Sequence, residues 1–452
     1  MRNSIPILVG LALAAFAAVS DAGTFTVNDA SDAGPGNCAG TCTLRDAIAS
    51  AATGDTIAFA LASPATIALN GQELLIYKSL NIAGPGPGLL TISGNNQSRV
   101  FEIANTATVS VQGLAIANGR LVGTPGANDP SGTTLPGSGG IAQGGAIYVG
   151  IGSNLWLSDC DIHDNAAIGG AGGTENSDIN SMAGGTGGPA EGGALYAAGD
   201  VRASHCTFRA NSAIGGQGGD NAAFFPAASG GNPAGGAGSD GHGGAIAGSG
   251  TVELIDVTLA GNHASGGNGG NLIFLQPNWP GGAGGNAGGG ALSIAGFSVF
   301  EFVTSAANSA VAGSGGFGIP AGPAGSATAS DLLLGATVVA RSSVFGSATA
   351  PACTLVAGGI SAQGANLDPD GSCPGFTLHT DPKLAPLAPN VGGRSVMFPL
   401  SGSPLIDAAI DCQDAFGTAV TDDELGTPRP QGSKCDLGAI EADYIFVDGF
   451  GG

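Results

Sequence analysis

The 452-residue chain is acidic and rich in glycine, with 12 Lys and Arg against 34 Asp and Glu, a formal net charge of -22, and 84 glycines. Nucleic acids and anionic membranes repel such a surface, so we expect neither as a partner. Because only 10% of the residues are charged and 43% are hydrophobic, the chain is not a disordered acidic tail. The composition instead indicates short apolar strands that are joined by tight turns.

Residues 1–22 have the pattern of a secretory signal peptide. Arg2 supplies a positive charge, residues 5–19 form an apolar run, and small residues follow at 20–23. A membrane anchor is the alternative, but it needs about 20 apolar residues with stop-transfer flanks. We therefore expect cleavage after Ser20 or Ala22, an extracellular or cell-surface protein, and no transmembrane segment after cleavage.

Eight cysteines in an exported chain suit an oxidising compartment. Sequence alone permits about 105 pairings of eight cysteines. Cys160 and Cys206 occupy the same position in a repeat, where a disulfide and a ladder of buried thiols are equally compatible with stacked strands. For the other six we predict pairing between near neighbours, namely Cys38–Cys42, Cys353–Cys373 and Cys412–Cys435.

The segment 41–54 predicts a short amphipathic helix. Leu44 and Ile48 lie four residues apart on one face, and Gly54 follows as a stop signal. A stack of repeats needs its open ends covered. We assign this helix to an N-terminal cap that spans residues 23–56.

The central part of the chain repeats two markers. The motif GGA recurs at 144–146, 192–194, 243–245 and 289–291, and an asparagine follows each time. The distance from GGA to the next asparagine is 21, 19, 19 and 19 residues, whereas the distance from each asparagine to the next GGA is 26, 27, 32 and 27. One half of the repeat is therefore nearly fixed, and the other half absorbs the variation. The asparagines are Asn118, Asn165, Asn211, Asn262 and Asn308.

This asymmetry predicts an all-β solenoid, a right-handed parallel β-helix over residues 57–332 with Gly-rich inserted loops on one edge. The fixed half is a rung of short strands whose alternate residues point inward. The asparagines suit left-handed turns in which each amide bonds to its stacked neighbours. Residues 333–442 lose the repeat and contain four cysteines, so we expect a disulfide-stapled C-terminal cap, followed by a short tail at 443–452.

Several segments resemble known families. Residues 24–51 resemble the CSLREA domain of exported bacterial proteins at Cys42, Leu44, Arg45 and Ala47. The GGAI motif and the pair Phe208 and Asn211 resemble polymorphic outer-membrane protein repeats and other pectate-lyase-like β-helices. These resemblances imply an exported β-helix rather than a particular reaction. The C-terminal region resembles the choice-of-anchor Q domain at ANLDPDGSC (365–373), DPKLAPL (381–387), GSPLIDAA (402–409), GTPRP (426–430) and CDLGAIE (435–441).

His242 stands in a Gly-His-Gly triplet, which pectin hydrolases of this fold also contain. Those enzymes need two carboxylates about 5–10 Å apart and a cation for the substrate. The equivalent repeat positions are Gln143, Glu191 and Gly288, and no Asp-Asp pair accompanies the histidine. We therefore interpret His242 as a solvent-facing loop residue without a chemical role.

Three further groups are candidates for a site. Arg202 and Arg209 lie in one rung, but no matching acidic ladder that a lyase would need is evident. The aromatic insert at 271–280, with Phe274 and Trp279, is expected to dock on the solenoid, and a contact patch is the alternative. The C-terminal acidic residues could bind Ca²⁺, although we favour a structural role in which they cap turns and pair with Arg429. These residues are Asp407, Asp422, Asp423, Asp436 and Glu441.

The sequence thus favours a secreted or cell-surface β-helix with a structural, adhesive or carbohydrate-contact role. We assign no catalytic residue and no cofactor. The expected partner is an extracellular polysaccharide or a cell-surface component, and an acidic polysaccharide would need a bridging cation or a local basic cleft. The alternative is an extracellular polysaccharide lyase or glycoside hydrolase of the pectate-lyase-like class.

Overall fold

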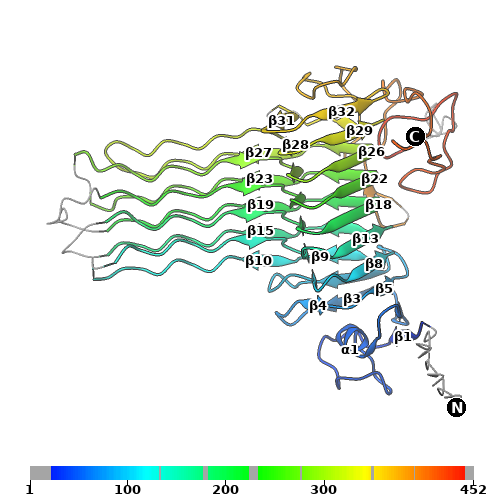
Figure 1. Ribbon diagram of the computed structural model, residues 1–452, viewed down its shortest axis with the longest axis horizontal. Helices are drawn as coiled ribbons and strands as arrows, with labels where there is room; N and C mark the ends of the chain where they lie inside the picture. The colour runs from blue at the N-terminus through cyan, green and yellow to red at the C-terminus, as the bar shows by residue number, and fades with distance from the viewer. Residues whose placement is uncertain are drawn as a thin grey trace, which may run out of the picture.

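The computed structural model describes residues 22–442, apart from 132–133, 177–181, 223–232, 275–276, 348–350 and 391. Residues 1–21 of the predicted signal peptide and the predicted tail at 443–452 lie outside the described residues. The chain forms a right-handed parallel β-helix with one short helix at its N-terminal end, and long extended segments project from one side (Figure 1).

Each turn of the β-helix contributes a strand to three faces. The first face is an eight-stranded parallel sheet. Its strands are β4 (Leu74–Ile76), β7 (Phe101–Ile103), β12 (Ile147–Val149), β17 (Leu195–Ala197), β21 (Ile246–Gly248), β25 (Leu292–Ile294), β28 (Leu332–Leu334) and β31 (Cys353–Leu355).

The second and third faces belong to one fifteen-stranded sheet. The second face holds β1 (Thr24–Val27), β2 (Thr56–Phe59), β5 (Leu80–Ala83), β8 (Thr108–Gln112), β13 (Asn154–Ser158), β29 (Val338–Arg341) and β32 (Ile360–Gln363). The third face holds β3 (Ala65–Ala68), β6 (Leu90–Ser93), β9 (Ala115–Ala117), β14 (Asp161–His163) and β30 (Val344–Phe345). Three long strands, β18 (Asp200–Arg209), β22 (Val252–Ala260) and β26 (Ser298–Ala306), turn the corner and serve both faces.

The corner between these two faces is made by one left-handed residue per rung. His205, Asp256 and Phe302 have φ angles of 52°, 51° and 51° and interrupt the long strands. The strands on either side still pair with the rung above and below. Strand pairing also continues to Gln363, past the boundary at residue 332 that the repeats predicted, because later rungs lack the GGA marker but keep the inward apolar residues.

The interior of the β-helix is filled by the inward residues of all three faces. In β13, Leu155 and Leu157 are buried and Trp156 between them is exposed, as the alternation of a strand requires. Phe208 and Phe300 are among the largest fully buried side chains. This continuous apolar column makes the stack of rungs one hydrophobic core.

A ladder of buried asparagines joins the rungs where the arms begin. Nδ2 of Asn165, Asn211 and Asn262 each donates to Oδ1 of the asparagine above, at 2.9, 3.0 and 3.0 Å, and Asn308 ends the ladder. The predicted bonding between stacked amides is therefore present. The left-handed turn, however, lies one residue earlier in these rungs, for example at Asp164 with φ 55°.

Asn118 differs from the other four predicted asparagines. It has a φ of 51° and aligns with Asp164, and the ladder position in its rung is Gly119. The Gly119 N–H donates to Oδ1 of Asn165 at 2.7 Å. The asparagine side chain must point into the stack to reach its neighbours, so the chain turns before the ladder position and not at it.

The Gly-rich inserts form ordered arms and not irregular loops (Figure 1). Each arm leaves the body, returns, and pairs with the arms above and below. The outgoing strands are β10 (Arg120–Val122), β15 (Ala166–Ile168), β19 (Ser212–Ile214), β23 (His263–Ser265) and β27 (Ser309–Val311). The returning strands are β11 (Ala142–Gln143), β16 (Ala190–Glu191), β20 (Gly241–His242) and β24 (Ala287–Gly288).

Beyond these strands the arms repeat every three residues, which is the period of polyproline II. The Gly172 N–H donates to Gln217 O in the next outgoing arm at 2.8 Å, and the Gly173 N–H donates to Gly137 O in a returning arm at 2.8 Å. A Cβ on Gly218 would lie 1.9 Å from Gly236 O. In most triplets two glycines thus face neighbouring backbones, and the third residue faces solvent.

The N-terminal end is covered by helix α1 (Leu44–Ser50), where Leu44 and Ile48 are buried as predicted. Thr43 and Asp46 form a reciprocal capping box at its start. The helix ends before the predicted stop at Gly54, since Ala51 is already extended, and the Lys78 ammonium donates to the backbone carbonyls of Ala49 and Ala51 at this end.

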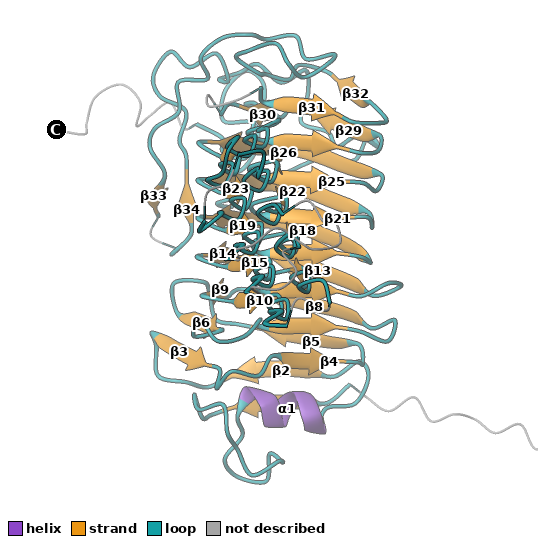
Figure 2. Ribbon diagram, turned by 90° about the vertical axis from the view of Figure 1, so that its left-hand side faces the viewer, coloured by secondary structure: helices purple, strands orange, loops and turns teal. Residues whose placement is uncertain are grey.

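The C-terminal segment, residues 365–442, does more than cover the end of the stack. Its antiparallel hairpin, β33 (Ala388–Pro389) and β34 (Ser395–Val396), runs alongside the rungs (Figure 2). Met397 packs against Ala260 and Ala306 of the third face. The structure contains the three predicted disulfides, Cys38–Cys42, Cys353–Cys373 and Cys412–Cys435, while Cys160 and Cys206 are buried free thiols.

Candidate functional site

His242 lies in strand β20 and not in a solvent-facing loop as the sequence suggested. It pairs with Glu191 below and Gly288 above, the equivalent positions that the repeats predicted. Its side chain is 25% exposed, and Nε2 lies 3.8 Å from Oδ2 of Asp240. The histidine lowers the pKa of the Asp240 carboxyl through a side-chain hydrogen bond. This single contact at the base of the arms supports a local structural role.

Arg202 and Arg209, the two arginines of one rung, have acidic partners that were not predicted from the sequence. Arg209 Nε lies 3.1 Å from Oδ1 of Asp161, which is buried in the rung below. Arg202 Nε lies 3.5 Å from Oε1 of Glu253 in the rung above. The partners are 48 and 51 residues away in sequence and become neighbours only through stacking.

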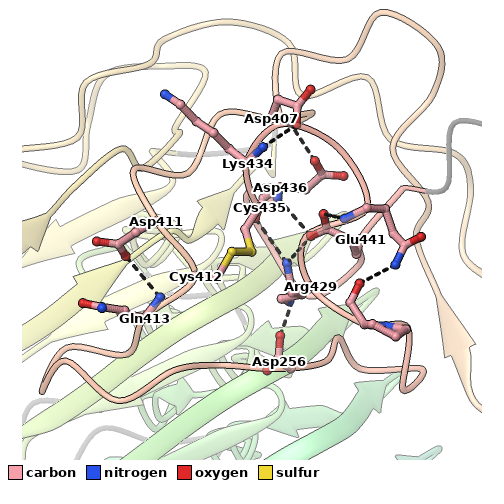
Figure 3. Close-up of a disulfide and its surroundings, with 12 residues drawn as sticks. Asp256, Asp407, Asp411, Cys412, Gln413, Arg429, Lys434, Cys435, Asp436 and Glu441 are labelled. Carbon is pink, nitrogen blue, oxygen red and sulfur yellow. Dashed lines mark hydrogen bonds and ion pairs between the residues drawn. A yellow bond between two sulfur atoms is a disulfide. The ribbon is translucent and has the colours of Figure 1, made fainter.

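The C-terminal carboxylates hold turns together and accept bonds from backbone N–H groups (Figure 3). Asp407 Oδ1 accepts from the Lys434 N–H, and Glu441 Oε2 pairs with Arg429 at 2.9 Å. Asp423 Oδ1 accepts from the Leu425 and Thr427 N–H groups, Asp436 Oδ1 accepts from the Asp407 N–H, and Asp422 lies 4.0 Å from His205. Over the described residues, no group of three His, Cys, Asp or Glu is arranged to hold a metal ion.

A buried polar joint fastens the C-terminal segment to the third face. Arg429 is fully buried and donates to Asp256 of the β22 corner at 2.8 Å as well as to Glu441. Glu424 is buried between two rungs, where Oε1 lies 2.7 Å from the Thr207 hydroxyl and Oε2 accepts from Thr258.

Burial raises the pKa of Glu424 to about 8. The geometry is consistent with a protonated acid, because the Thr207 hydroxyl also lies 2.9 Å from Ser395 O and has one hydrogen to donate. When that hydrogen goes to Ser395 O, only a protonated Glu424 completes the contact with Thr207. A neutral Glu424 carboxyl therefore allows both contacts of the Thr207 hydroxyl to be hydrogen bonds.

The outward side of the second face presents an aromatic platform. Trp156 is 56% exposed on β13, with Ser110 in the rung below and Arg202 in the rung above. These residues and Ser158 and Ser204 line a shallow hollow of about 280 Å³. The platform therefore combines an apolar ring with hydroxyl groups and one guanidinium that is paired with a carboxylate.

A larger cavity of about 690 Å³ lies at the adjoining corner, between the 84–89 loop and the C-terminal hairpin. Its polar lining includes Gln112, Asp159, Asn390 and Arg394. Arg394 Nη1 contacts Oδ1 of Asp159 at 2.9 Å and His205 O at 2.7 Å, which fixes the hairpin to the rungs. Gln112 pairs in register with Ser158 of the platform, so the two hollows meet at one edge of the second face.

The aromatic insert at 271–280 is partly packed against its neighbours, in line with the docking that the sequence led us to expect. Trp279 is buried, and its carbonyl accepts from the Ile319 N–H at 2.7 Å. Phe274 remains 39% exposed on the same arm. Trp279 therefore belongs to the packing of the arms. No helix of the described chain has the length and hydropathy to cross a bilayer.

Comparison with known proteins adds a likeness of fold only. No family model matches the chain, and no curated protein matches it. A crystal structure of a pectate lyase aligns over 94% of this chain and 97% of its own, with 14% identity and a TM-score of 0.32.

Trp156 is not among the residues predicted from the sequence, although its strand carries a signal for it. In NLWLS the leucines occupy the inward positions of a strand, so the tryptophan between them has to face outward. What could not be read from the sequence is which residues share a hollow with it, since Ser110 and Arg202 come from the rungs on either side.

Proposed function

We propose that the protein is an extracellular β-helix that binds neutral sugar residues of a polysaccharide on the second face, with Trp156 as the platform. The supporting observation is an exposed indole at an outward strand position, flanked by polar side chains over a hollow of about 280 Å³. The C–H face of a sugar ring is apolar and its rim carries hydroxyl groups, so such a ring suits an aromatic plate with donors and acceptors at its edge.

Charge favours a neutral ligand at this platform. Glu253 already lies 3.5 Å from the Arg202 guanidinium, and the whole chain carries a net charge of -22. An anionic chain would meet repulsion that one paired arginine does not offset. The adjoining cavity of about 690 Å³, with amide, carboxylate and guanidinium groups, offers room for further rings of the same chain.

The test is binding of purified protein to a panel of neutral and acidic polysaccharides by affinity electrophoresis and calorimetry. Trp156→Ala should weaken binding of the neutral ligand about tenfold or more, because a central aromatic contact contributes roughly 2 kcal/mol. Phe317→Ala is the matched control, since that aromatic is 60% exposed but lies on an arm. Unchanged affinity in Trp156→Ala would refute the proposal.

A second candidate function, cleavage of a polysaccharide, rests on Glu301. This carboxyl lies on the same face, and burial raises its pKa to about 7, which suits a general acid. However, Glu301 is fully buried and Oε1 accepts from the Ala415 N–H of the C-terminal segment at 2.5 Å. The binding assays should therefore also measure new reducing ends. If the wild type produces reducing ends and Glu301→Gln does not, the result would favour cleavage.

A further inference from the structure

A hollow of about 520 Å³ lies at the foot of the arms, on the first rungs of the β-helix. We call it the Arg120 hollow. Its walls are the turns at 71–73 and 96–99 and strand β10, and its lining includes Gln72, Glu73, Ser98, Arg99 and Arg120. None of these residues belongs to the Trp156 platform.

Arg120 is unusual in this acidic protein because its charge has no acidic partner. Every other arginine of the described chain has a carboxylate within 4.0 Å, whereas Arg120 has none. The equivalent strand positions in the next two rungs are Ala166 and Ser212, so neither provides a carboxylate to pair with Arg120. An unpaired guanidinium on a chain of net charge -22 is a natural anion-binding group.

Two residues that line the same hollow also carry a buried polar atom without a hydrogen-bond partner among the described atoms. The two atoms are Nε of Arg99 and Oγ of Ser98. Arg99 is held in place by its other atoms, since Nη1 contacts Glu73 and Glu102 at 3.0 and 3.1 Å. Its guanidinium also stacks 5.3 Å from the Tyr148 ring centroid. Buried donors of this kind are rarely left unsatisfied, so the two atoms are candidates to bond an acceptor that enters the hollow.

We propose that the Arg120 hollow binds the oxyanion of an acidic saccharide, a carboxylate or a sulfate, with Arg120 as counter-ion and Arg99 Nε and Ser98 Oγ as hydrogen-bond donors. The amide of Gln72 and its polar neighbours in the two turns suit the hydroxyl groups of the sugar. This proposal does not rest on the Trp156 platform, which is expected to take neutral rings.

The carboxylates near the hollow do not prevent anion binding. Glu73 and Glu102 share the Arg99 guanidinium, so part of their charge is already neutralised. Burial raises the pKa of the Glu73 carboxyl, which makes proton uptake easier when a second anion arrives. Arg120 then supplies the remaining positive charge.

The experiment is calorimetric titration of the full mature chain with three probes, namely glucuronate, N-acetylglucosamine 6-sulfate and glucose. We expect at least one anion to bind with an affinity that falls as salt rises and that depends on Arg120, whereas any binding of glucose at the Trp156 platform should be unaffected by Arg120→Gln. The anion that binds identifies the source of the oxyanion. Absence of binding by both anions would overturn the proposal.

Two variants and one control locate the site. Arg120→Gln should weaken binding about tenfold or more, as expected for loss of a charge-assisted hydrogen bond, and Ser98→Ala should weaken it less. Trp156→Ala should leave anion binding unchanged, which separates this site from the proposed neutral-sugar platform. Wild-type affinity in Arg120→Gln would refute the assignment, and circular dichroism checks that each variant is folded.

Discussion

The body of the β-helix and its arms come from the same repeat but are held together by different contacts. In the body, inward side chains such as Leu157 and Phe208 are removed from water, and the hydrophobic effect stabilises the stack. In the arms, the backbones themselves are in contact, and Gly218 leaves no room for a side chain. The body therefore tolerates exchange among apolar residues of similar volume, whereas most inner positions of the arms, such as that of Gly218, accept only glycine.

The two regions also differ in which residues face solvent. Body strands alternate, so every second residue is outward and available for a site such as the Trp156 platform. Arm segments present only one residue in three, for example Gln217 between pairs of glycines. Sites with several converging side chains are consequently found on the body and at the foot of the arms.

The largest effect is expected from a cavity in the body. Phe208→Ala removes a fully buried ring and should lower the free energy of unfolding by about 3–5 kcal/mol. Urea unfolding monitored by circular dichroism measures this loss. Phe317→Ala, on an exposed arm position, is the control and should change stability by less than about 0.5 kcal/mol. Equal effects would show that the body is not the principal source of stability.

Loss of the Cys412–Cys435 disulfide should destabilise the C-terminal segment by about 3 kcal/mol, because the bond closes a loop with a sequence separation of 23. The double variant Cys412→Ser/Cys435→Ser tests this expectation. Limited proteolysis should cut the segment before the body. Simultaneous digestion of both would mean that the segment and the rungs unfold as one unit.

A single methyl group should disturb the arms without unfolding the body. Gly218→Ala places a Cβ 1.9 Å from Gly236 O and should cost about 1–3 kcal/mol. Hydrogen exchange should increase in the neighbouring arms and remain slow in β18. The adjacent Gln217→Ala is the control, because that side chain faces solvent. Equal protection in both variants would contradict backbone packing of the arms.

Stability should fall as pH rises, because of the joint between the body and the C-terminal segment. The folded-state pKa of Glu424 is raised from 4.5 to about 8, so the folded protein holds this proton more tightly than the unfolded chain. The stabilisation is complete below about pH 4.5 and is lost as pH rises through about 8, by at most about 1.4 kcal/mol per unit. Urea unfolding between pH 5 and 9 measures the slope.

Glu424→Gln keeps hydrogen-bonding groups near Thr207 and Thr258 but cannot titrate, so its slope over this range should be smaller. Asp370→Asn, a change at a carboxyl in an exposed turn, is the control and should retain the wild-type slope. A slope that is identical in wild type and Glu424→Gln would show that other groups dominate the pH dependence.

The smallest effect is expected at His242, where the arms meet the body. His242→Ala removes one contact to Asp240 and should change stability by about 0.5 kcal/mol or less. Incubation with polygalacturonate, with and without Ca²⁺, should give the same result for the variant and the wild type. Wild-type cleavage that the substitution abolishes would assign this histidine a catalytic role.

Sequence alone predicted the β-helix, because its evidence is local and repeated. The spacing of GGA and asparagine gave the length of a rung, and alternation gave its inward residues. The sequence also distinguishes the first and the last arm of the stack from the arms between them. Each arm is one layer of a stack. Gly170 packs against the arm below, and the equivalent position in the first arm, which has no arm below it, is Thr124. Gly281 packs against the arm above, and the equivalent position in the last arm is Ala321. A side chain is tolerated where no further arm has to fit.

Tertiary structure alone decided which distant side chains meet. Residues in adjacent rungs are separated by about one repeat, and a shift of one position changes the partner, as Asn118 and Gly119 illustrate. The ion pair of Arg209 with Asp161 and the polar residues around Trp156 depend on this register. Composition indicates a net charge, but only stacking determines that Arg120 is left without a carboxylate partner among the described residues, since pairing is set by distances across rungs and not along the chain.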